Sequence, residues 1–400
     1  MYRCTGRAVP VGILVLWSMP RKRTKKRKLV LIDEAPADAI APATPITPPH
    51  TSVTGAAALF ETWQEQDADS KRAGHAVLEW LLHPMSPQTF FDKYWEQKPL
   101  VIRRPEAPDY YAGFFCRGDI DQLLANGKLT FEQDLDITKY VDGKRHLYNG
   151  TGLVSGDEAW AKFRDGCSLR MLCPQSHCPK VWRLLSLLEH CFGSFVGANS
   201  YLTPAATQGF APHYDDIEAF ILQVEGAKEW RVYAPVSPGE TLPRSSSADL
   251  THADIGEPVL TATLRAGELL YFPRGWVHEA RSVTDADSLH LTVSTALRHT
   301  WRDLLEILLP ATLDLAASED IDFRQTLPPD MREYMGVMHS GGDLPEGYGA
   351  DEDGDGSDPR RRVFNAKLGE LLLRCTAPTV LPTDGSVDQV GEPSALNTAA

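Results

Sequence analysis

The sequence has few of the features that mark membrane, secreted or nucleotide-binding proteins. No apolar run approaches the ~20 residues that cross a bilayer. Only 7 cysteines occur among 400 residues, an odd number without repeating spacing, which indicates a reducing compartment rather than a disulfide framework. There is no Gly-rich phosphate loop, no nucleophile motif and no internal repeat. The net charge of −14 lacks the basic excess of a general nucleic-acid binder, but it suits a basic protein partner.

The N-terminal region differs in composition from the rest of the chain. Residues 21–28 (RKRTKKRK) form a dense basic run that is typical of a nuclear localisation signal, the alternative being a solvated arm. This run stands where a secretory signal would carry small residues, so we expect nuclear import rather than secretion. Residues 35–50, rich in Ala, Pro and Thr, are predicted to be a disordered linker. We therefore assign residues 1–73 to a disordered, basic and Pro-rich N-terminal region.

The hydrophobic pattern changes from helical to strand-like and back. Helices are predicted over 76–82, from Ser86-Pro87 until before Pro99, over 119–125 and from 181 to Gly193, with a short strand at 100–103. Strands are predicted at 195–202, 217–224, 229–233, 259–264, 268–272 and 289–295, with a turn at 225–228. Such a series of short strands predicts a sandwich or barrel. The helical period returns at 301–317, where Pro310 should kink or break the helix, and again at 364–374.

Two histidines and one aspartate are spaced to hold a metal ion. His213 and Asp215 would lie on one face of an extended segment, because strand side chains alternate with period 2. His278 follows the Gly-containing turn at 273–277, where a ligand can be aimed inward. Two imidazoles and one carboxylate on one face of a metal form the facial triad of non-heme Fe(II) oxygenases. His290 is the alternative third ligand, but a lone histidine inside a strand is more often a core residue.

Polar side chains inside the predicted strands indicate a buried anionic ligand. Lys228 is predicted at the start of the return strand of a hairpin, strand 229–233, and a lysine pointing into a barrel is costly unless an anion meets it. Asn199 and Tyr201 alternate on one strand, as His290, Thr292 and Ser294 do on a late one. A bound dicarboxylate and a metal would give these buried polar groups partners.

Several longer stretches carry a family resemblance, namely residues 199–204 (NSYLTP), 212–220 (PHYDDIEAF) and 222–233 (LQVEGAKEWRVY). They resemble the JmjC-domain ribosomal oxygenases. The upstream stretches 79–84 (EWLLHP) and 90–100 (FFDKYWEQKPL) resemble the nucleolar branch of that family. The resemblance covers about residues 76 to 338. It implies a mainly β fold with α additions, namely a double-stranded β-helix (jelly roll) with a helical N-terminal lead-in and a C-terminal helical dimerisation segment.

The resemblance also implies Fe(II) as the metal, with 2-oxoglutarate and dioxygen as co-substrates. The residues that fall on the family's functional positions form three groups. The catalytic metal ligands are His213, Asp215 and His278. The co-substrate contacts are Lys228, which pairs with the distal carboxylate, together with Asn199 and Ser294. The residues that line the substrate site are Arg170 and Tyr201.

The implied function is hydroxylation of a histidine in a ribosomal protein, with histone H3 lysine demethylation as a second activity and a role in chromatin and transcription. The alternative is a catalytically weak JmjC scaffold that acts in transcriptional repression. We expect a location in the nucleus and nucleolus, and no nucleic-acid or membrane partner. Residues 74–299 are assigned to the catalytic jelly roll with its lead-in. Residues 300–340 are assigned to the dimerisation region of a homodimer, and 341–400 to an acidic loop, an incomplete winged-helix remnant and a disordered tail.

Overall fold

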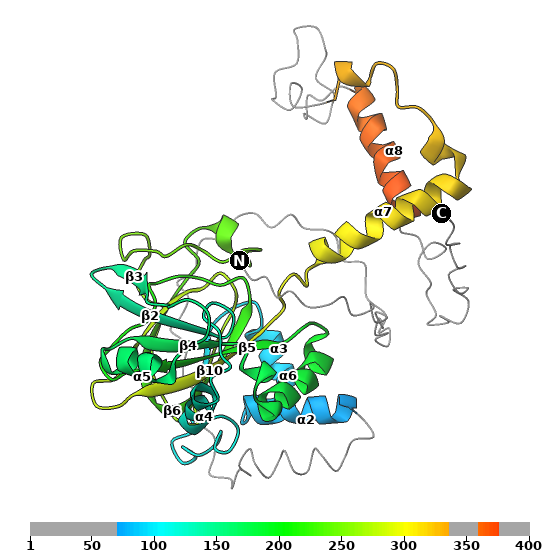
Figure 1. Ribbon diagram of the computed structural model, residues 1–400. Coiled ribbons are helices and arrows are strands. Elements are labelled where there is room, and N and C mark those ends of the chain that lie inside the picture. The colour runs from blue at the N-terminus through cyan, green and yellow to red at the C-terminus, as the bar shows by residue number, and fades with distance from the viewer. Residues whose placement is uncertain (1–69, 336–358, 376–400) are drawn as a thin grey trace, which may run out of the picture. The chain divides into compact units, whose positions relative to one another are not determined.

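The computed structural model describes residues 70–335 and 359–375, which are coloured in Figure 1. They fall into two compact units, one ending at Thr300 and the other beginning at Trp301. The basic run 21–28, the linker 35–50, most of the acidic segment after residue 341 and the tail from 376 lie outside the described residues. Within the described ranges, no helix is long and apolar enough to cross a bilayer.

The lead-in consists of two helices and a short strand. Helix α2 spans Ser70–Leu82, helix α3 spans Pro87–Lys93 and strand β1 spans Leu100–Ile102. As predicted, Ser86 caps α3, and its hydroxyl accepts a hydrogen bond from the backbone N–H of Thr89 (3.2 Å). Helix α3 ends earlier than predicted, because the chain leaves helical geometry after Lys93 and Glu96 adopts a left-handed backbone with φ of 56°.

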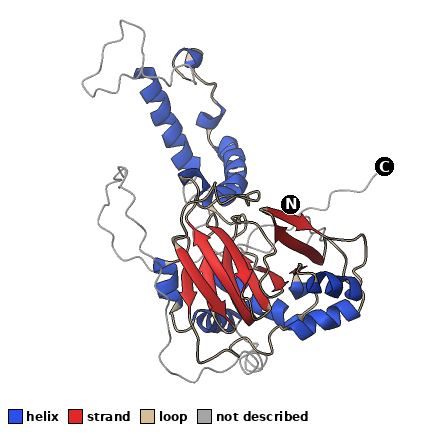
Figure 2. Ribbon diagram, turned by 90° about the vertical axis from the view of Figure 1, so that its left-hand side faces the viewer, coloured by secondary structure: helices blue, strands red, loops and turns tan. Residues whose placement is uncertain are grey.

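Three further helices pack around the sheet. Helix α4 spans Arg117–Ala125, α5 spans Gly156–Arg164 and α6 spans Pro179–Phe192, of which α5 was not predicted. Helix α6 ends at Gly193, whose φ of 63° suits glycine. Apolar side chains of α2, α3 and α6 form one core with Leu222 and Leu291 of the sheet, so helices cover one face of it. Figure 2 shows this layering of helices in blue against strands in red.

The strands form one ten-stranded antiparallel system. Its path runs β1-β8-β6-β10-β5-β4-β2-β3, and β7 and β9 pair with the second half of β6. The strand bounds are β2 Leu135–Val141, β3 Lys144–Leu147, β4 Ser168–Leu172, β5 Gly197–Thr203, β6 Glu218–Tyr233, β7 Leu260–Arg265, β8 Leu269–Phe272, β9 Val277–Ser282 and β10 Ser288–Thr295. The mainly β jelly-roll class with helical additions is confirmed.

The turn predicted at 225–228 is wrong. Residues 218–233 form one continuous strand, β6, which pairs with β10 and β8 through its first half and with β7 and β9 through its second. Gly226 bends the strand with a φ of 65°, and a Cβ at this position would lie 1.8 Å from the carbonyl oxygen of Asp287. Lys228 therefore lies past a bend inside a strand, and not on the return arm of a hairpin.

The two parts of β6 enclose a second core between the sheets. Ile221, Leu270 and Phe272 from one sheet pack with Trp230 and Val232 from the other. Strand register extends this inner face along the larger sheet. Residues directly opposite in antiparallel strands share a face, so the inner face of Ile221 continues through the pairs Ile221↔Thr292 and Thr292↔Asn199. The polar side chains of Asn199 and Thr292, which alternate with apolar residues in the sequence, therefore point into the space between the two sheets.

The unit that begins at Trp301 is helical. Helix α7 spans Trp301–Glu319 and helix α8 spans Pro359–Cys375, and the two contact each other. Helix α8 extends beyond the predicted 364–374. Helix α7 runs through Pro310 as one helix, so the predicted break there does not occur. Short 3₁₀ turns lie at 174–176, 238–240, 321–324 and 331–333.

Candidate metal centre

Two backbone hydrogen bonds join the segments that carry His213 and His278. The N–H of His278 donates to the carbonyl oxygen of His213 (2.8 Å), and the N–H of His213 donates to that of His278 (3.2 Å). His278 lies on strand β9, directly after the turn at 273–276, whereas His213 forms an isolated bridge rather than part of a regular strand. The N–H of Gly275 also donates to the carbonyl oxygen of Asp215 (3.0 Å). These bonds bring two distant segments of the chain to one point.

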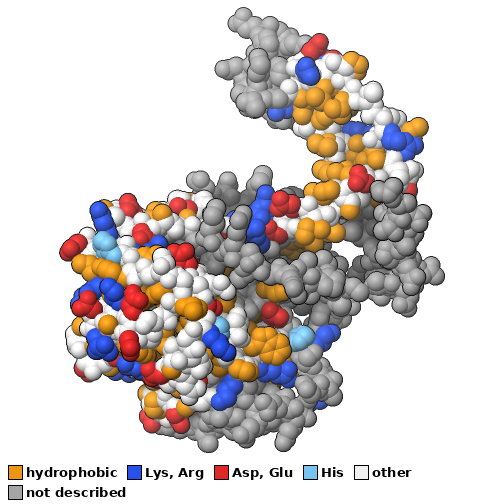
Figure 3. Space-filling view, viewed as in Figure 1, with side chains coloured by type: hydrophobic (Ala, Val, Ile, Leu, Met, Phe, Trp, Pro, Cys, Tyr) orange, Lys and Arg blue, Asp and Glu red, His pale blue; other side chains and the backbone are white. Residues whose placement is uncertain are grey.

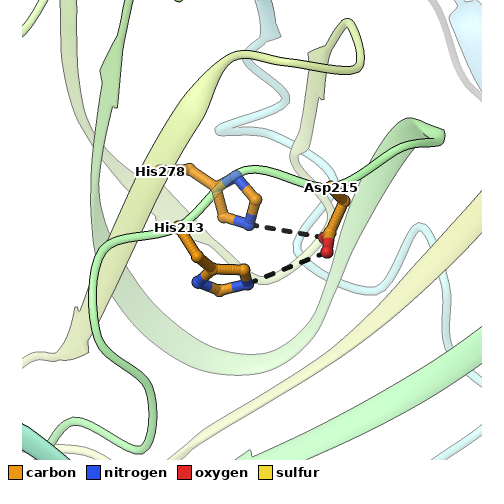
Figure 4. A group of neighbouring side chains, drawn as sticks. All are labelled: His213, Asp215 and His278. Atoms are coloured by element: carbon orange, nitrogen blue, oxygen red, sulfur yellow. Dashed lines mark ion pairs between the residues drawn. The ribbon is translucent and has the colours of Figure 1, made fainter. Parts of the chain in front are cut away.

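The three side chains converge, as Figure 4 shows. Asp215 Oδ2 lies 3.7 Å from His278 Nε2, and Asp215 Oδ1 lies 4.0 Å from His213 Nε2. One possible ligand atom from each residue lies within 4.8 Å of the other two. Among the described residues this is the one such group of three or more His, Cys, Asp or Glu side chains. The three ligand atoms lie close enough together for all three residues to bind a single ion.

The orientation of both imidazoles fits a metal. Nδ1 of His213 donates to the carbonyl oxygen of Ala211 (2.8 Å), and Nδ1 of His278 donates to that of Trp276 (3.1 Å). Each bond places the proton on Nδ1 and leaves the Nε2 lone pair facing Asp215. Metal-bound histidines are usually fixed in this way by a carbonyl or carboxylate on the other ring nitrogen. The donor set of two nitrogens and one carboxylate suits a non-heme iron with open positions.

Burial favours the form of His278 that binds metals. Its side chain is buried beside the rings of Phe272 and His213. Desolvation, helped by the neighbouring His213, lowers the pKa of His278 to about 4. The imidazole is therefore neutral at physiological pH, as metal binding requires.

Lys228 lies on the same face of β6 as Trp230 and is almost fully buried, with 5% of its surface exposed. Its ammonium donates to the hydroxyl of Thr203 (3.1 Å) and lies 5.9 Å from the centre of the Trp230 ring. No carboxylate among the described residues pairs with it. Burial lowers the pKa of Lys228 to about 7. A buried amine without a counter-ion is costly, and an anionic ligand would relieve that cost.

Two buried polar atoms near Lys228 and the triad have no protein partner. Trp230 Nε1 and His290 Nδ1 are each inaccessible to solvent and lack a hydrogen bond. The ring of Trp230 lies 6.3 Å from that of His278 and 5.3 Å from that of His290. Buried polar groups are normally hydrogen-bonded, so these orphaned atoms fit a space that takes a polar ligand. The residues present therefore fit both a metal and an anionic co-substrate.

The other predicted residues lie in ordered rows on the inner face. Asn199 faces Thr292 across β5 and β10, and Ser294 stands opposite Gly197 one step further along. Arg170 faces Tyr201 across β4 and β5. Arg170, Tyr201, Asn199 and Ser294 are half-buried. The structure thus brings the candidate residues for co-substrate and substrate binding to one face of the sheet. Because they are only half-buried, part of each side chain is accessible to a ligand.

Phe210 links the substrate candidates to the metal site and was not predicted. Its ring lies 5.4 Å from Tyr201 and 6.1 Å from His213, measured between centroids. The guanidinium groups of Arg170 and Arg145 each lie 5.5 Å from the centre of the same ring. Arg170 is also paired with the carboxylate of Asp136. The position of Phe210 three residues before His213 was the available signal in the sequence.

His290 does not join the triad. It is buried and stacks on Tyr201, with ring centroids 4.8 Å apart. Desolvation, together with the charge of Lys228, lowers its pKa well below the usual value. Both histidines are held neutral by burial, so geometry decides between them: His278 belongs to the group of converging ligand atoms and His290 does not. Thr203 and Trp230 are further inner-face residues that the sequence reasoning missed, although both continue the alternation through Tyr201 and Lys228.

Comparison with known proteins indicates the class to which this chain is similar. A family model described as the JmjC domain matches residues 170–304, which hold the triad, Lys228 and most of the jelly roll. Ribosomal oxygenase 1 of Gallus gallus is 46% identical over 321 residues, covering 80% of this chain and 51% of the relative. The bifunctional lysine-specific demethylase and histidyl-hydroxylase NO66 of Dictyostelium discoideum is 42% identical over 323 residues, covering 81% and 60%. The X-ray structure of E. coli ycfD is 17% identical, with a TM-score of 0.46, and the match covers 72% of this chain and 67% of that one.

Residues 170–304 thus match the JmjC domain, and over about four fifths of its length the chain is similar to ribosomal oxygenases, the resemblance that its motifs predicted. It spans about half the length of the ribosomal oxygenase 1 relative that it matches.

Proposed function

We propose that this protein is an Fe(II)- and 2-oxoglutarate-dependent dioxygenase that hydroxylates a histidine of a ribosomal protein. The observation that carries the proposal is the convergence of His213, Asp215 and His278 in the same inner space as the buried, uncompensated Lys228. When bound, ferrous iron supplies the oxidising chemistry that couples decarboxylation of 2-oxoglutarate to insertion of oxygen into a C–H bond. The products would be succinate, carbon dioxide and an alcohol.

The residues of the chain bind and orient the reactants. The triad would hold the iron, with both rings fixed by their Nδ1 hydrogen bonds to carbonyl groups. Lys228 would receive the distal carboxylate of 2-oxoglutarate, and Asn199 and Ser294 would contact the same molecule along the inner face. The apolar walls around this space exclude water and strengthen the charge pairing.

Arg170 and Tyr201 would line the peptide site at the edge of the metal centre. The two guanidinium groups close to Phe210 disfavour a second cation there and so favour a neutral target side chain. Both a methylammonium and an imidazole could stack on a ring, but Phe210 already has the cations of Arg145 and Arg170 close to it. Tyr201 is stacked on His290. These neighbours compete with the aromatic cage that a methylated lysine requires.

Histone H3 lysine demethylation is the second candidate activity, favoured by the name of the Dictyostelium discoideum relative. Mass spectrometry of a ribosomal-protein peptide and a methylated histone H3 peptide, each incubated with iron and 2-oxoglutarate, separates the two. Hydroxylation adds one oxygen, whereas demethylation removes a methyl group. We expect the oxygen gain. If neither peptide changes and no succinate forms, the alternative of a JmjC scaffold in transcriptional repression is favoured.

We also propose that the protein forms a homodimer through the helical unit after Thr300. Large apolar side chains are exposed on α7 and α8, with Trp301 81%, Ile307 75% and Leu373 75% accessible. Orange patches along these helices are visible in Figure 3. Exposed apolar surface on this scale is typical of an interaction site. Sedimentation equilibrium of the full chain would report a dimer if the proposal holds and a monomer if it does not.

For location we propose the nucleus and nucleolus, with a role in chromatin and transcription regulation. The basic run 21–28 supports nuclear import. A fluorescent fusion of the full chain should accumulate in nuclei, and deletion of residues 21–28 should disperse it. An unchanged distribution after the deletion would contradict the role of the basic run.

A further inference from the structure

Beside the metal site, four side chains close a buried ring of hydrogen bonds and ion pairs. The Tyr271 hydroxyl donates to the carboxylate of Glu218 (2.5 Å), and the backbone N–H of Glu96 donates to the Tyr271 hydroxyl (2.9 Å). The guanidinium of Arg274 reaches Glu218 (3.5 Å) on one side and the Glu96 carboxylate (2.7 Å) on the other. We name Glu96, Glu218, Tyr271 and Arg274 the polar ring.

The polar ring joins three segments of the chain. Glu218 stands three residues after Asp215, at the start of β6, and Arg274 stands four residues before His278, in the turn that leads into β9. Glu96 comes from the lead-in, inside the stretch YWEQKP that resembles the family but has no role in the site described above. The backbone N–H of Arg274 also donates to Glu218 (3.3 Å). The ring thus spans the two segments that carry metal ligands.

Burying the charged groups of the polar ring costs free energy, so stability alone does not explain the ring. Glu218 and Tyr271 are fully buried, and Arg274 is 6% exposed. Burial raises the pKa of Glu218 to about 7, against the opposing effects of Tyr271 and Arg274. Glu96 adopts a left-handed backbone, which is unfavourable for a residue with a Cβ. Well-packed apolar side chains are often at least as stable as a buried ion pair, so a buried polar network at this position points to a demand for a defined geometry.

We propose that the polar ring is a positioning device that sets the spacing between Asp215 and His278 and so couples the lead-in to the metal centre. The inference rests on the proposed function only in that the triad must bind a metal. Among the described residues, no hydrogen bond or ion pair joins these four side chains to the triad, so each acts as a positioning residue. Opening the ring should therefore weaken metal binding while leaving the co-substrate contact of Lys228 in place.

The test measures Mn²⁺ affinity by titration calorimetry on the full chain without co-substrate. The variants are Glu218→Gln, which removes the central charge, and Glu96→Gln, which opens the ring at a side chain that is 36% exposed. We expect each to weaken Mn²⁺ binding by about tenfold, the lower end of the range for residues that orient metal ligands. In turnover assays at saturating metal, the KM for 2-oxoglutarate should stay unchanged.

A matched control is available on the neighbouring strand connection. Glu268 is 4% exposed and pairs with Arg103 (2.6 Å) from the lead-in, as Glu218 and Glu96 pair with Arg274, but it lies in the turn before β8 and away from the ligand segments. Glu268→Gln should lower the melting temperature without changing Mn²⁺ affinity. If it weakens Mn²⁺ binding as much as Glu218→Gln does, the ring has no special role and the inference is overturned.

The outcomes separate the inference from the proposed function. If the wild-type chain binds no Mn²⁺, the metal site itself is refuted. If the wild type binds and both ring variants bind equally well, the ring is structural and the inference fails. Should Glu218→Gln not fold, the Mn²⁺ affinity of Glu96→Gln decides in the same way.

Discussion

Replacing Lys228 by methionine should make the ligand-free protein more stable. Burial lowers the pKa of the Lys228 amine from 10.5 to about 7, and each pKa unit corresponds to about 1.4 kcal/mol. Burying this amine therefore destabilises the folded protein by on the order of 5 kcal/mol. The variant loses the hydrogen bond to Thr203 and the weak contact with Trp230, together worth about 2 kcal/mol. Thr203 keeps its bond with Ser168 (3.0 Å). The net gain in unfolding free energy should be about 3 kcal/mol near pH 7.

The assay is urea denaturation of both proteins with and without 2-oxoglutarate, in the presence of Mn²⁺. The co-substrate should stabilise the wild type and leave Lys228→Met unaffected, because the buried charge that pairs with the distal carboxylate is gone. For the wild type, affinity for 2-oxoglutarate should fall as the pH rises above about 7, where the free amine loses its proton. A variant that is less stable than the wild type, yet is still stabilised by 2-oxoglutarate, would refute this reasoning.

Three further predictions concern the triad and the helical unit. His213→Ala should abolish 2-oxoglutarate turnover with an unchanged circular dichroism spectrum, whereas His252→Ala, which alters an exposed histidine, should leave turnover intact. Because the pKa of His278 is about 4 when folded and 6.5 when unfolded, the metal-free protein should lose about 3 kcal/mol of stability as the pH falls from 6.5 to 4. Urea denaturation in a chelator should show this loss, and His278→Ala should lack that component. Ile307→Glu on α7 should shift the full chain from dimer to monomer in sedimentation, with an unaltered melting temperature for the jelly roll.

Strand alternation predicted most of the jelly roll but failed where polar residues broke the pattern. The sequence around Gly226, with charged neighbours on both sides, looks like a turn, yet it is a bend that carries β6 from one sheet to the other. Strands β2, β3, β4 and β9 were not predicted. All four residues of β3 are exposed, and polar or charged residues such as Asp136, Arg170 and Glu279 interrupt the apolar pattern of the other three. Only the pairing partners reveal such segments as strands, and partners are not visible in a single sequence.

The site was easier to predict than its surroundings. Lys228 was identifiable because a lysine is chemically unusual in an apolar strand, and the triad because two histidines and an aspartate are spaced as metal ligands; the structure brings the three predicted ligands together. Phe210 and Thr203 are ordinary residues whose importance depends on strand register. Glu218 did carry a signal, since it is a carboxylate heading the apolar run AFIL, but its partners Arg274 and Tyr271 lie more than fifty residues away.

The most direct test of the central claim is a crystal structure of the full chain grown without oxygen, with Mn²⁺ and 2-oxoglutarate. We predict one metal ion bound by Nε2 of His213, Nε2 of His278 and the carboxylate of Asp215, with the distal carboxylate of 2-oxoglutarate on the ammonium of Lys228. An ion bound elsewhere, or a co-substrate whose distal carboxylate avoids Lys228, would contradict the account.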